Sequence, residues 1–316
     1  MTEYGSTRFG RVLTAMATAM DSNGEVDYDR TVDLARWLVG NGTEALIVTG
    51  TTGEAPTLTD EEKISIWEAV SSSVTVPVVA GSGSNDTRHS VHMSKKATEV
   101  GASGLLLVTP YYNRPPQSGL LAHFEAVAKV CDLPVIIYDI PVRTGRKVES
   151  ETLLELISRC PNVVALKDAA GDPGGTSKLL PRLPDYFELY SGDDGLTLPL
   201  LAIGAVGVIG VATHWAAFGY QEMISSFIAG DEARAQRINE ALIPSVDFES
   251  TMDAPNPMPV KVLLNELGLE VGETRLPLGS APGYLKKQAR DVFVRTNSAL
   301  STLGVQVAKP KKEIRD

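Results

Sequence analysis

A lysine stands near the end of an apolar, β-type run, where a charged side chain is unexpected. Residues 163–169 read Val-Val-Ala-Leu-Lys-Asp-Ala, which puts Lys167 directly after four apolar residues. Burial of an ammonium group is costly and lowers its pKa. A lysine that is partly neutral near physiological pH can attack a carbonyl carbon and form a Schiff base. The alternative is a structural lysine whose charge reaches solvent or pairs with Asp168, and this run alone favours that alternative.

Other polar residues with suitable chemistry stand at the ends of further apolar runs. They are Thr51, Thr52, Tyr112, Tyr138 and Arg143, and the segment Ser191-Gly192-Asp193-Asp194 ends a further run. Threonine hydroxyls beside glycines can approach an anion, a tyrosine hydroxyl can move protons, and an arginine can bind a carboxylate with two hydrogen bonds. Each residue also has an ordinary interpretation in a turn, a surface loop, a surface ion pair or a helix cap. Together with Lys167, however, they indicate imine chemistry on a small keto acid.

Eight apolar runs would position these residues. They occupy residues 12–18, 45–50, 77–83, 104–110, 134–140, 163–169, 187–193 and 207–213. Such runs are typical of parallel sheets covered on both faces, and the segments between them carry helix signals such as the capping box from Thr59 to Glu62. The pattern predicts an α/β fold, a (β/α)8 TIM barrel, with its chemistry at the carboxyl ends of the strands. A doubly wound sheet is the second choice, because residues 21–24 lack the glycine-rich dinucleotide turn.

The pattern changes near residue 230. Residues 231–241, 259–267 and 284–303 favour helices, separated by loops that contain proline or glycine, and no β-type run follows them. We therefore predict a TIM barrel over residues 1–229 and a C-terminal helical appendage over residues 230–316.

Composition excludes some classes of function. The net charge of −10 argues against a nucleic-acid partner and against a polybasic membrane patch, and no apolar run approaches the length of a membrane span. Two isolated cysteines, Cys131 and Cys160, fit a reducing compartment, so we expect a cytoplasmic protein. Residues 8–20 resemble a short signal peptide, but they also supply the first strand of the regular series, and we interpret them as that strand.

The motifs do not support a metal centre or a bound cofactor. His89, His92 and His123 are expected on helix surfaces, and His214 follows a strand alone, so the histidines lack ligand spacing. Residues 204–210 are rich in glycine but lack the dinucleotide spacing and the phosphate-binding lysine. We predict neither a metal nor a cofactor.

From about residue 10 to about residue 300 the chain resembles the dihydrodipicolinate synthase family, which belongs to the pyruvate-dependent class I aldolases. The motifs that carry this resemblance lie in residues 50–54, 109–115, 138–144 and 165–169. The resemblance implies that Lys167 forms the Schiff base and that Tyr138 relays protons. It also implies that Thr51 and Tyr112 support Tyr138, with Tyr112 reaching into the site of a neighbouring subunit. A dimer, and a homotetramer built as a dimer of dimers, would follow.

The same resemblance implies roles for the remaining candidates. Thr52 would hold the pyruvate carboxylate, Gly192 and Ile209 would lie close to bound pyruvate, and Arg143 would bind the carboxylate of L-aspartate 4-semialdehyde. The implied reaction condenses these two substrates to 4-hydroxy-tetrahydrodipicolinate, the entry step to diaminopimelate and lysine.

Some positions depart from the family pattern. Asp139 replaces a usual asparagine, with little expected effect on the chemistry. Some members are inhibited by lysine at a site that uses histidines and a carboxylate. The corresponding positions here are Asp60, Lys63 and His89. A cationic Lys63 and the lost carboxylate should disfavour a cationic amino acid, so we predict weak or absent inhibition by lysine.

Two other functions remain open on the sequence. Another pyruvate-dependent aldolase, such as N-acetylneuraminate lyase or a keto-deoxy sugar acid aldolase, would share the lysine and the tyrosine. Arg143, followed by Thr144 and Gly145, favours a small carboxylated aldehyde over a sugar acid. A catalytically silent barrel that binds a keto acid is the second alternative, and the intact set of lysine, tyrosine and arginine disfavours it.

Overall fold

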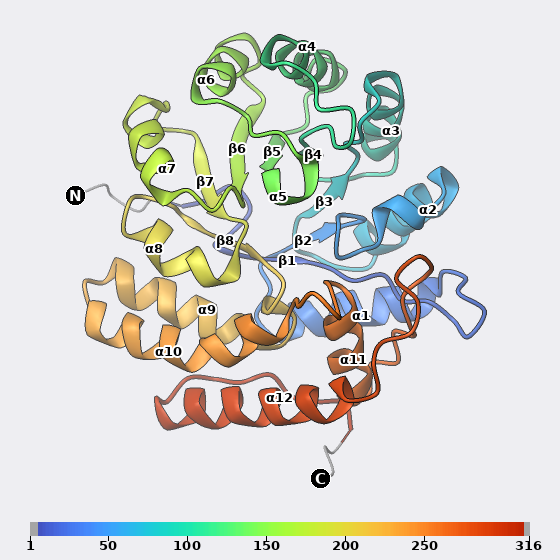
Figure 1. The fold of residues 1–316 in the computed structure, drawn as a ribbon, viewed down its shortest axis with the longest axis vertical. Coiled ribbons are helices and arrows are strands. Elements are labelled where there is room, and N and C mark those ends of the chain that lie inside the picture. Colours follow the sequence, from blue (N-terminus) through green and yellow to red (C-terminus); the bar gives the residue numbers. More distant parts are fainter. Residues whose placement is uncertain (1–5, 313–316) are drawn as a thin grey trace.

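The computed structural model describes residues 6–312, which form a closed barrel of parallel strands surrounded by helices (Figure 1). The strands follow one another around the barrel in chain order, and the first pairs with the last. They are β1 (Val12–Ala15), β2 (Ala45–Val48), β3 (Val78–Gly81), β4 (Gly104–Val108), β5 (Val135–Asp139), β6 (Val163–Asp168), β7 (Glu188–Ser191) and β8 (Gly207–Gly210). The predicted TIM barrel is confirmed. The segment that resembled a signal peptide contains β1, which pairs with β2 and β8.

Helices connect successive strands and cover the outside of the barrel. They are α1 (Tyr28–Gly40), α2 (Asp60–Ser71), α3 (Thr87–Glu99), α4 (Gln117–Ala128), α5 (Pro141–Thr144), α6 (Ser150–Arg159), α7 (Pro173–Leu179), α8 (Thr197–Leu201) and α9 (Thr213–Ile228). Three short 3₁₀ turns accompany them: η1 (Ala55–Thr57), η2 (Leu180–Arg182) and η3 (Asp194–Leu196). The predicted capping box at α2 is present, because the Thr59 side chain bonds the Glu62 amide and the Glu62 side chain bonds the Thr59 amide.

Two apolar layers hold the barrel together, and strand alternation assigns each side chain to one of them. The inner layer fills the barrel and includes Tyr138, Ala165 and Ile209, whereas the outer layer lies between strands and helices and includes Leu166. Because Ala165 points inward and Leu166 outward, Lys167 points inward again. Burial on both faces explains why the strands are near-continuous apolar runs.

The C-terminal region is helical, as predicted. It contains α10 (Glu232–Phe248), α11 (Met258–Glu266) and α12 (Leu285–Thr302), which lie together on one side of the barrel, with α10 against α9 (Figure 1). The first of these helices is longer than the sequence pattern suggested and continues through Pro244. The division of the chain after residue 229 stays a prediction, and residues 313–316 of the predicted appendage lie outside the described residues. No helix in the described part of the chain is both long and apolar enough to cross a membrane.

Candidate active site

Lys167 and Tyr138 meet at the carboxyl ends of neighbouring strands. They are paired in register across β5 and β6, so both side chains enter the barrel at the same level. The Lys167 Nζ lies 4.2 Å from the centroid of the Tyr138 ring. Both side chains are buried, with exposed fractions of 4% for Lys167 and 5% for Tyr138. The structure therefore places the predicted nucleophile beside the predicted proton-transfer group.

The surroundings of Lys167 favour a partly neutral amine. Burial lowers its pKa from 10.5 to about 8, although the carboxylates of Asp194 and Glu249 act in the opposite direction. Asp168 does not serve as its partner, because the Asp168 carboxylate accepts hydrogen bonds from the Ala170 amide at 2.9 Å and the Thr176 hydroxyl at 2.5 Å. The alternative of a structural lysine, exposed or paired with Asp168, is therefore wrong.

Gly192, directly after β7, leaves room for the lysine side chain. A Cβ atom at this position would lie 2.8 Å from Lys167 Cγ and 3.1 Å from Lys167 Cε. Any side chain here would displace the lysine, so the glycine keeps open the path that Lys167 follows through the barrel.

Tyr138 is held as a neutral phenol. Burial raises its pKa to about 12, and the positive charge of Arg143 and a hydrogen bond with Thr51 act in the opposite direction. At neutral pH the hydroxyl therefore keeps its proton and can both donate and accept a hydrogen bond. Thr51 and Arg143 approach Tyr138 from β2 and β5 respectively, through the segments that follow each strand.

A cavity of about 480 Å³ opens above these residues. Thr51, Tyr138 and Arg143 line it, together with Asp60, Lys63 and His89 from the entrance of α2 and α3. The cavity is lined by residues after β2, β3, β4 and β5, which is the end of a TIM barrel where chemistry takes place. Its size suits a small ligand.

Thr52 is buried and bonded to a residue that the sequence analysis missed. The Asn256 side-chain amide donates to Thr52 Oγ1 at 2.9 Å, across the interface between the β2 loop and the C-terminal region. Asn256 precedes α11 in a Pro-Asn-Pro segment, and its local sequence carries no catalytic signal. Sequence reasoning also gave no role to Asp194, which anchors the segment after β8 by accepting from the backbone amides of Val211 and Ala212.

The two remaining candidates differ in their positions. Ile209 lies on β8 in the inner apolar layer, where it packs with Tyr138 and Tyr190. Tyr112 is 91% exposed and has a left-handed backbone with φ of 70°. A single chain therefore does not bring Tyr112 to Lys167. The preceding residue, Tyr111, lines the cavity of this chain instead.

Histidine positions differ in part from expectation. His123 is buried, not exposed, because it lies on the α4 face that also buries Leu120 and Phe124. His214 is buried and accepts from the Ala17 amide at 3.1 Å. Burial lowers the pKa of both rings to about 4, so both are neutral near pH 7. Within residues 6–312, no group of three or more His, Cys, Asp or Glu side chains is arranged to hold a metal ion.

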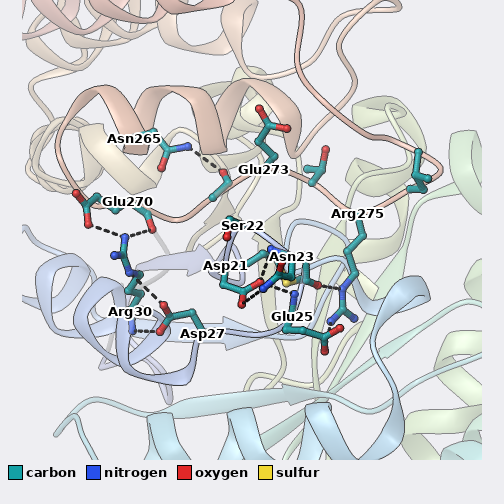
Figure 2. Close-up of a pocket in the computed structure, with 15 residues that line it drawn as sticks. Asp21, Ser22, Asn23, Glu25, Asp27, Arg30, Asn265, Glu270, Glu273 and Arg275 are labelled. Atoms are coloured by element: carbon teal, nitrogen blue, oxygen red, sulfur yellow. Dashed lines mark hydrogen bonds and ion pairs between the residues drawn. The ribbon is translucent and has the colours of Figure 1, made fainter.

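A larger cavity lies elsewhere in the molecule and contains none of the predicted site residues. It has a volume of about 1160 Å³ and lies between residues 20–30 and residues 265–276 (Figure 2). Its charged lining includes Asp21, Glu270 and Arg275. We assign the candidate active site to the smaller cavity, because Thr51, Tyr138 and Arg143 line it and Lys167 lies against the Tyr138 ring.

Comparison with known proteins agrees with the sequence resemblance. The model of the dihydrodipicolinate synthetase family matches residues 8–295. The 4-hydroxy-tetrahydrodipicolinate synthase of Thermosynechococcus vestitus is 46% identical over 290 residues, which cover 91% of this chain and 97% of that protein. The enzyme of the same name from Bacillus subtilis is 46% identical over 272 residues, which cover 85% of this chain and 93% of that protein.

Solved structures give the same result for the fold. A dihydrodipicolinate synthase from Bacillus anthracis has a TM-score of 0.87 and 43% identity, covering 92% of this chain and 99% of that chain. The lysine-bound enzyme of Cyanidioschyzon merolae has a TM-score of 0.90 and 41% identity, covering 92% of this chain and 99% of that chain. With a buried lysine and tyrosine at the carboxyl end of such a barrel, the chain belongs to the dihydrodipicolinate synthetase family.

Proposed function

We propose that the protein condenses pyruvate with L-aspartate 4-semialdehyde to 4-hydroxy-tetrahydrodipicolinate through a Schiff base on Lys167. The observation that carries this proposal is the pairing of a buried lysine, whose pKa is about 8, with Tyr138 in a chain of this family. A buried amine of this kind is the usual nucleophile for a ketone.

The reaction follows from the chemistry of these groups. The Lys167 nitrogen attacks the ketone carbon of pyruvate, and loss of water leaves an imine. Removal of a methyl proton, with Tyr138 as the relay, gives an enamine whose carbon bonds to the aldehyde carbon of the second substrate. The amino group of that substrate then attacks the imine carbon and displaces Lys167, which closes the six-membered ring. One water molecule is released overall.

The residues near the cavity divide these tasks. Thr51 bonds Tyr138 and would pass protons onward, to Tyr112 of a neighbouring subunit. Thr52 would hold the pyruvate carboxylate. The exposed Arg143, at the cavity wall, would bind the carboxylate of the semialdehyde with a bidentate pair.

Gly192 and Ile209 would border the bound pyruvate. Gly192 contacts the Lys167 stem, and Ile209 lies in the apolar layer at the bottom of the site. An apolar floor beneath a polar ring of hydroxyls suits the methyl and carboxylate ends of a small keto acid.

The assembly that we propose is a homotetramer formed as a dimer of dimers. The support comes from Tyr112, because its side chain is 91% exposed in one chain and aromatic side chains are enriched at subunit interfaces. We also propose the cytoplasm as its compartment, which the two free cysteines, Cys131 and Cys160, support.

The experiment that tests the function is borohydride reduction in the presence of pyruvate, followed by peptide mapping. We expect a stable mass increase on the peptide that contains Lys167, loss of trapping in Lys167→Ala, and slower turnover in Tyr138→Phe. If the Lys167 peptide gains no mass, the result would support the alternative of a catalytically silent barrel that binds a keto acid. A protein that traps pyruvate but turns over a sugar aldehyde faster than the semialdehyde would be another aldolase.

A further inference from the structure

The loop that carries Thr52 is held in place by the C-terminal region as well as by the barrel. Asn256 donates from Nδ2 to Thr52 Oγ1 at 2.9 Å, and both side chains are buried, with exposed fractions of 9% and 2%. The Asn256 backbone is held in place, because its backbone nitrogen donates to the Ser250 hydroxyl at 3.2 Å. The two residues are far apart in the chain but form a direct contact.

A second contact anchors the same loop two residues later. Lys261 on α11 donates from Nζ to Glu54 Oε1 at 2.7 Å and to the carbonyl oxygen of Glu273 at 2.8 Å. The other Glu54 oxygen accepts from the Arg275 backbone amide at 2.8 Å. The Glu54 and Lys261 side chains are only 2% and 1% exposed. Both carboxylate oxygens of Glu54 are thus satisfied by the C-terminal region.

The backbone of this loop needs such support. Glu54 has a left-handed conformation with φ of 59°, which costs energy for a residue with a side chain. The carbonyl oxygen of Gly53 accepts from the Thr18 hydroxyl at 2.8 Å. Contacts from the segment after β1 and from α11 therefore hold a strained turn on both sides.

The direction of the Asn256 bond decides what the Thr52 hydroxyl can do. Because the amide nitrogen is the donor, the hydroxyl oxygen is the acceptor and keeps its own proton for another partner. Among the described residues, no side chain or carbonyl oxygen accepts that proton. A carboxylate can only accept hydrogen bonds, so a hydroxyl with a free proton is the form that binds it.

We propose that Asn256 is a positioning residue that keeps the Thr52 hydroxyl as a hydrogen-bond donor to the carboxylate of the keto acid. The Glu54–Lys261 pair fixes the position of the loop that contains Thr52, relative to α11. The inference rests on the proposed function, in which Thr52 holds that carboxylate. It assigns to the C-terminal region a part in substrate binding that acts through Thr52.

The decisive variant is Asn256→Asp, which changes one amide group to a carboxyl group of the same shape. An ionised carboxylate would accept a hydrogen bond from the Thr52 hydroxyl, which reverses the direction of the bond. It would also repel the substrate carboxylate. A protonated carboxyl group can donate to Thr52 Oγ1 as the amide does. A buried carboxyl has a raised pKa, so this exchange should occur between about pH 5 and pH 8.

The measurement is the half-saturating pyruvate concentration in borohydride trapping, expressed at each pH as the ratio of variant to parent. The ratio cancels the titration of Lys167 itself. For Asn256→Asp we expect a ratio of about tenfold or more at pH 8, which falls toward one as the pH is lowered. For Asn256→Ala we expect a smaller ratio that does not change with pH.

Asn265→Asp is the matched control. Asn265 lies on α11 and donates from Nδ2 to the Gly272 carbonyl oxygen at 2.9 Å, away from the Thr52 loop. The same chemical change there should leave the ratio at one across the pH range. A purely structural effect of an added charge in the C-terminal region would raise the ratio for both variants alike and would overturn the proposal.

The remaining outcomes are separable. If the parent does not trap pyruvate, the proposed function fails. If the parent traps normally and the Asn256→Asp ratio is one, or is raised without pH dependence, only the positioning role fails. If Asn256→Asp does not fold, as judged by circular dichroism, Asn256→Ala and Thr52→Ala are combined in a double-mutant cycle. We expect the two substitutions to have non-additive effects on the half-saturating pyruvate concentration. Additive effects would overturn the proposal.

Discussion

Lys167 Nζ lies over the face of the Tyr138 ring, 4.2 Å from its centroid. The face of an aromatic ring attracts a cation and favours the charged amine. Burial has the larger effect, however, because the pKa of Lys167 is lowered to about 8. The amine is thus divided between a charged form that Tyr138 orients and a neutral form that attacks the substrate.

The pH dependence of imine formation should reflect this pKa. The neutral amine is the nucleophile, so protonation below pH 8 removes reactivity and deprotonation above pH 8 restores it fully. At pyruvate concentrations well below half-saturation, where the rate reports the free enzyme, we expect the trapping rate to fall about tenfold per unit below pH 7 and to reach a plateau above pH 9. Rates measured from pH 6 to pH 10 give the midpoint. A midpoint near 10.5 would show that Lys167 has an ordinary pKa.

Gly192→Ala should remove activity without removing the fold. The added Cβ would lie 2.8 Å from Lys167 Cγ, closer than carbon atoms approach in proteins, so the lysine must leave its position beside Tyr138. A displacement of about 1 Å in a reacting group costs about 10²-fold in rate. We expect at least this loss in kcat, with unchanged circular dichroism. Gly174→Ala, where the nearest atom to a Cβ is 3.7 Å away, is the control and should keep full activity.

Lys261→Met should strongly destabilise the protein. It leaves the buried Glu54 carboxylate without its charge partner, and breaking one side of a buried pair costs about 3–5 kcal/mol. We expect the thermal midpoint to fall by roughly 10 °C. The double variant Glu54→Gln with Lys261→Met removes both charges and should recover part of that loss. Arg182→Met, which breaks an exposed pair with Glu151, should not change the midpoint measurably. Equal shifts for the buried and the exposed pair would contradict this view.

Much of the barrel could be predicted because the patterns that determine its strands and helices lie within short segments of the sequence. Eight apolar runs and the helix signals between them reflect burial of each strand on both faces, and strand alternation brings Lys167 and Tyr138 together once the barrel closes. The prediction that His123 lies on the surface was wrong, although Leu120 and Phe124 in the sequence mark the buried face of its helix.

The support of the β2 loop could not be predicted in the same way. Asn256 and Lys261 lie about 200 residues after Thr52 and Glu54, and no local pattern relates them. Their contacts depend on how α11 packs against the barrel, which is a property of the whole fold. The environment of Tyr112 could not be predicted for a different reason, because its proposed partner is a second chain.

Subunit mixing tests the proposed role of Tyr112. Tyr112→Phe and Lys167→Ala should each be nearly inactive, the first by loss of the proton relay and the second by loss of the nucleophile. In a mixed dimer, one site combines an intact Lys167 with an intact Tyr112 from the other chain. We therefore expect activity to return when the two variants are denatured together and refolded. Each variant refolded alone is the control, and mixtures that stay inactive would place Tyr112 outside the partner's site.

Inhibition by lysine should be weak or absent in this protein. The Asp60 carboxylate is paired with His89, from Oδ1 to Nε2 at 2.8 Å, so an added ammonium group would share this carboxylate with His89. Lys63 lies in the same cavity wall and is half-buried, so its positive charge faces any cation that enters. Initial rates with and without 10 mM lysine, roughly ten-thousandfold above a dissociation constant of about 1 μM, should agree. Lys63→Ala, which removes the repelling charge, is the matched variant and should be the more sensitive of the two. A clear fall in the parent rate at millimolar lysine would contradict the prediction.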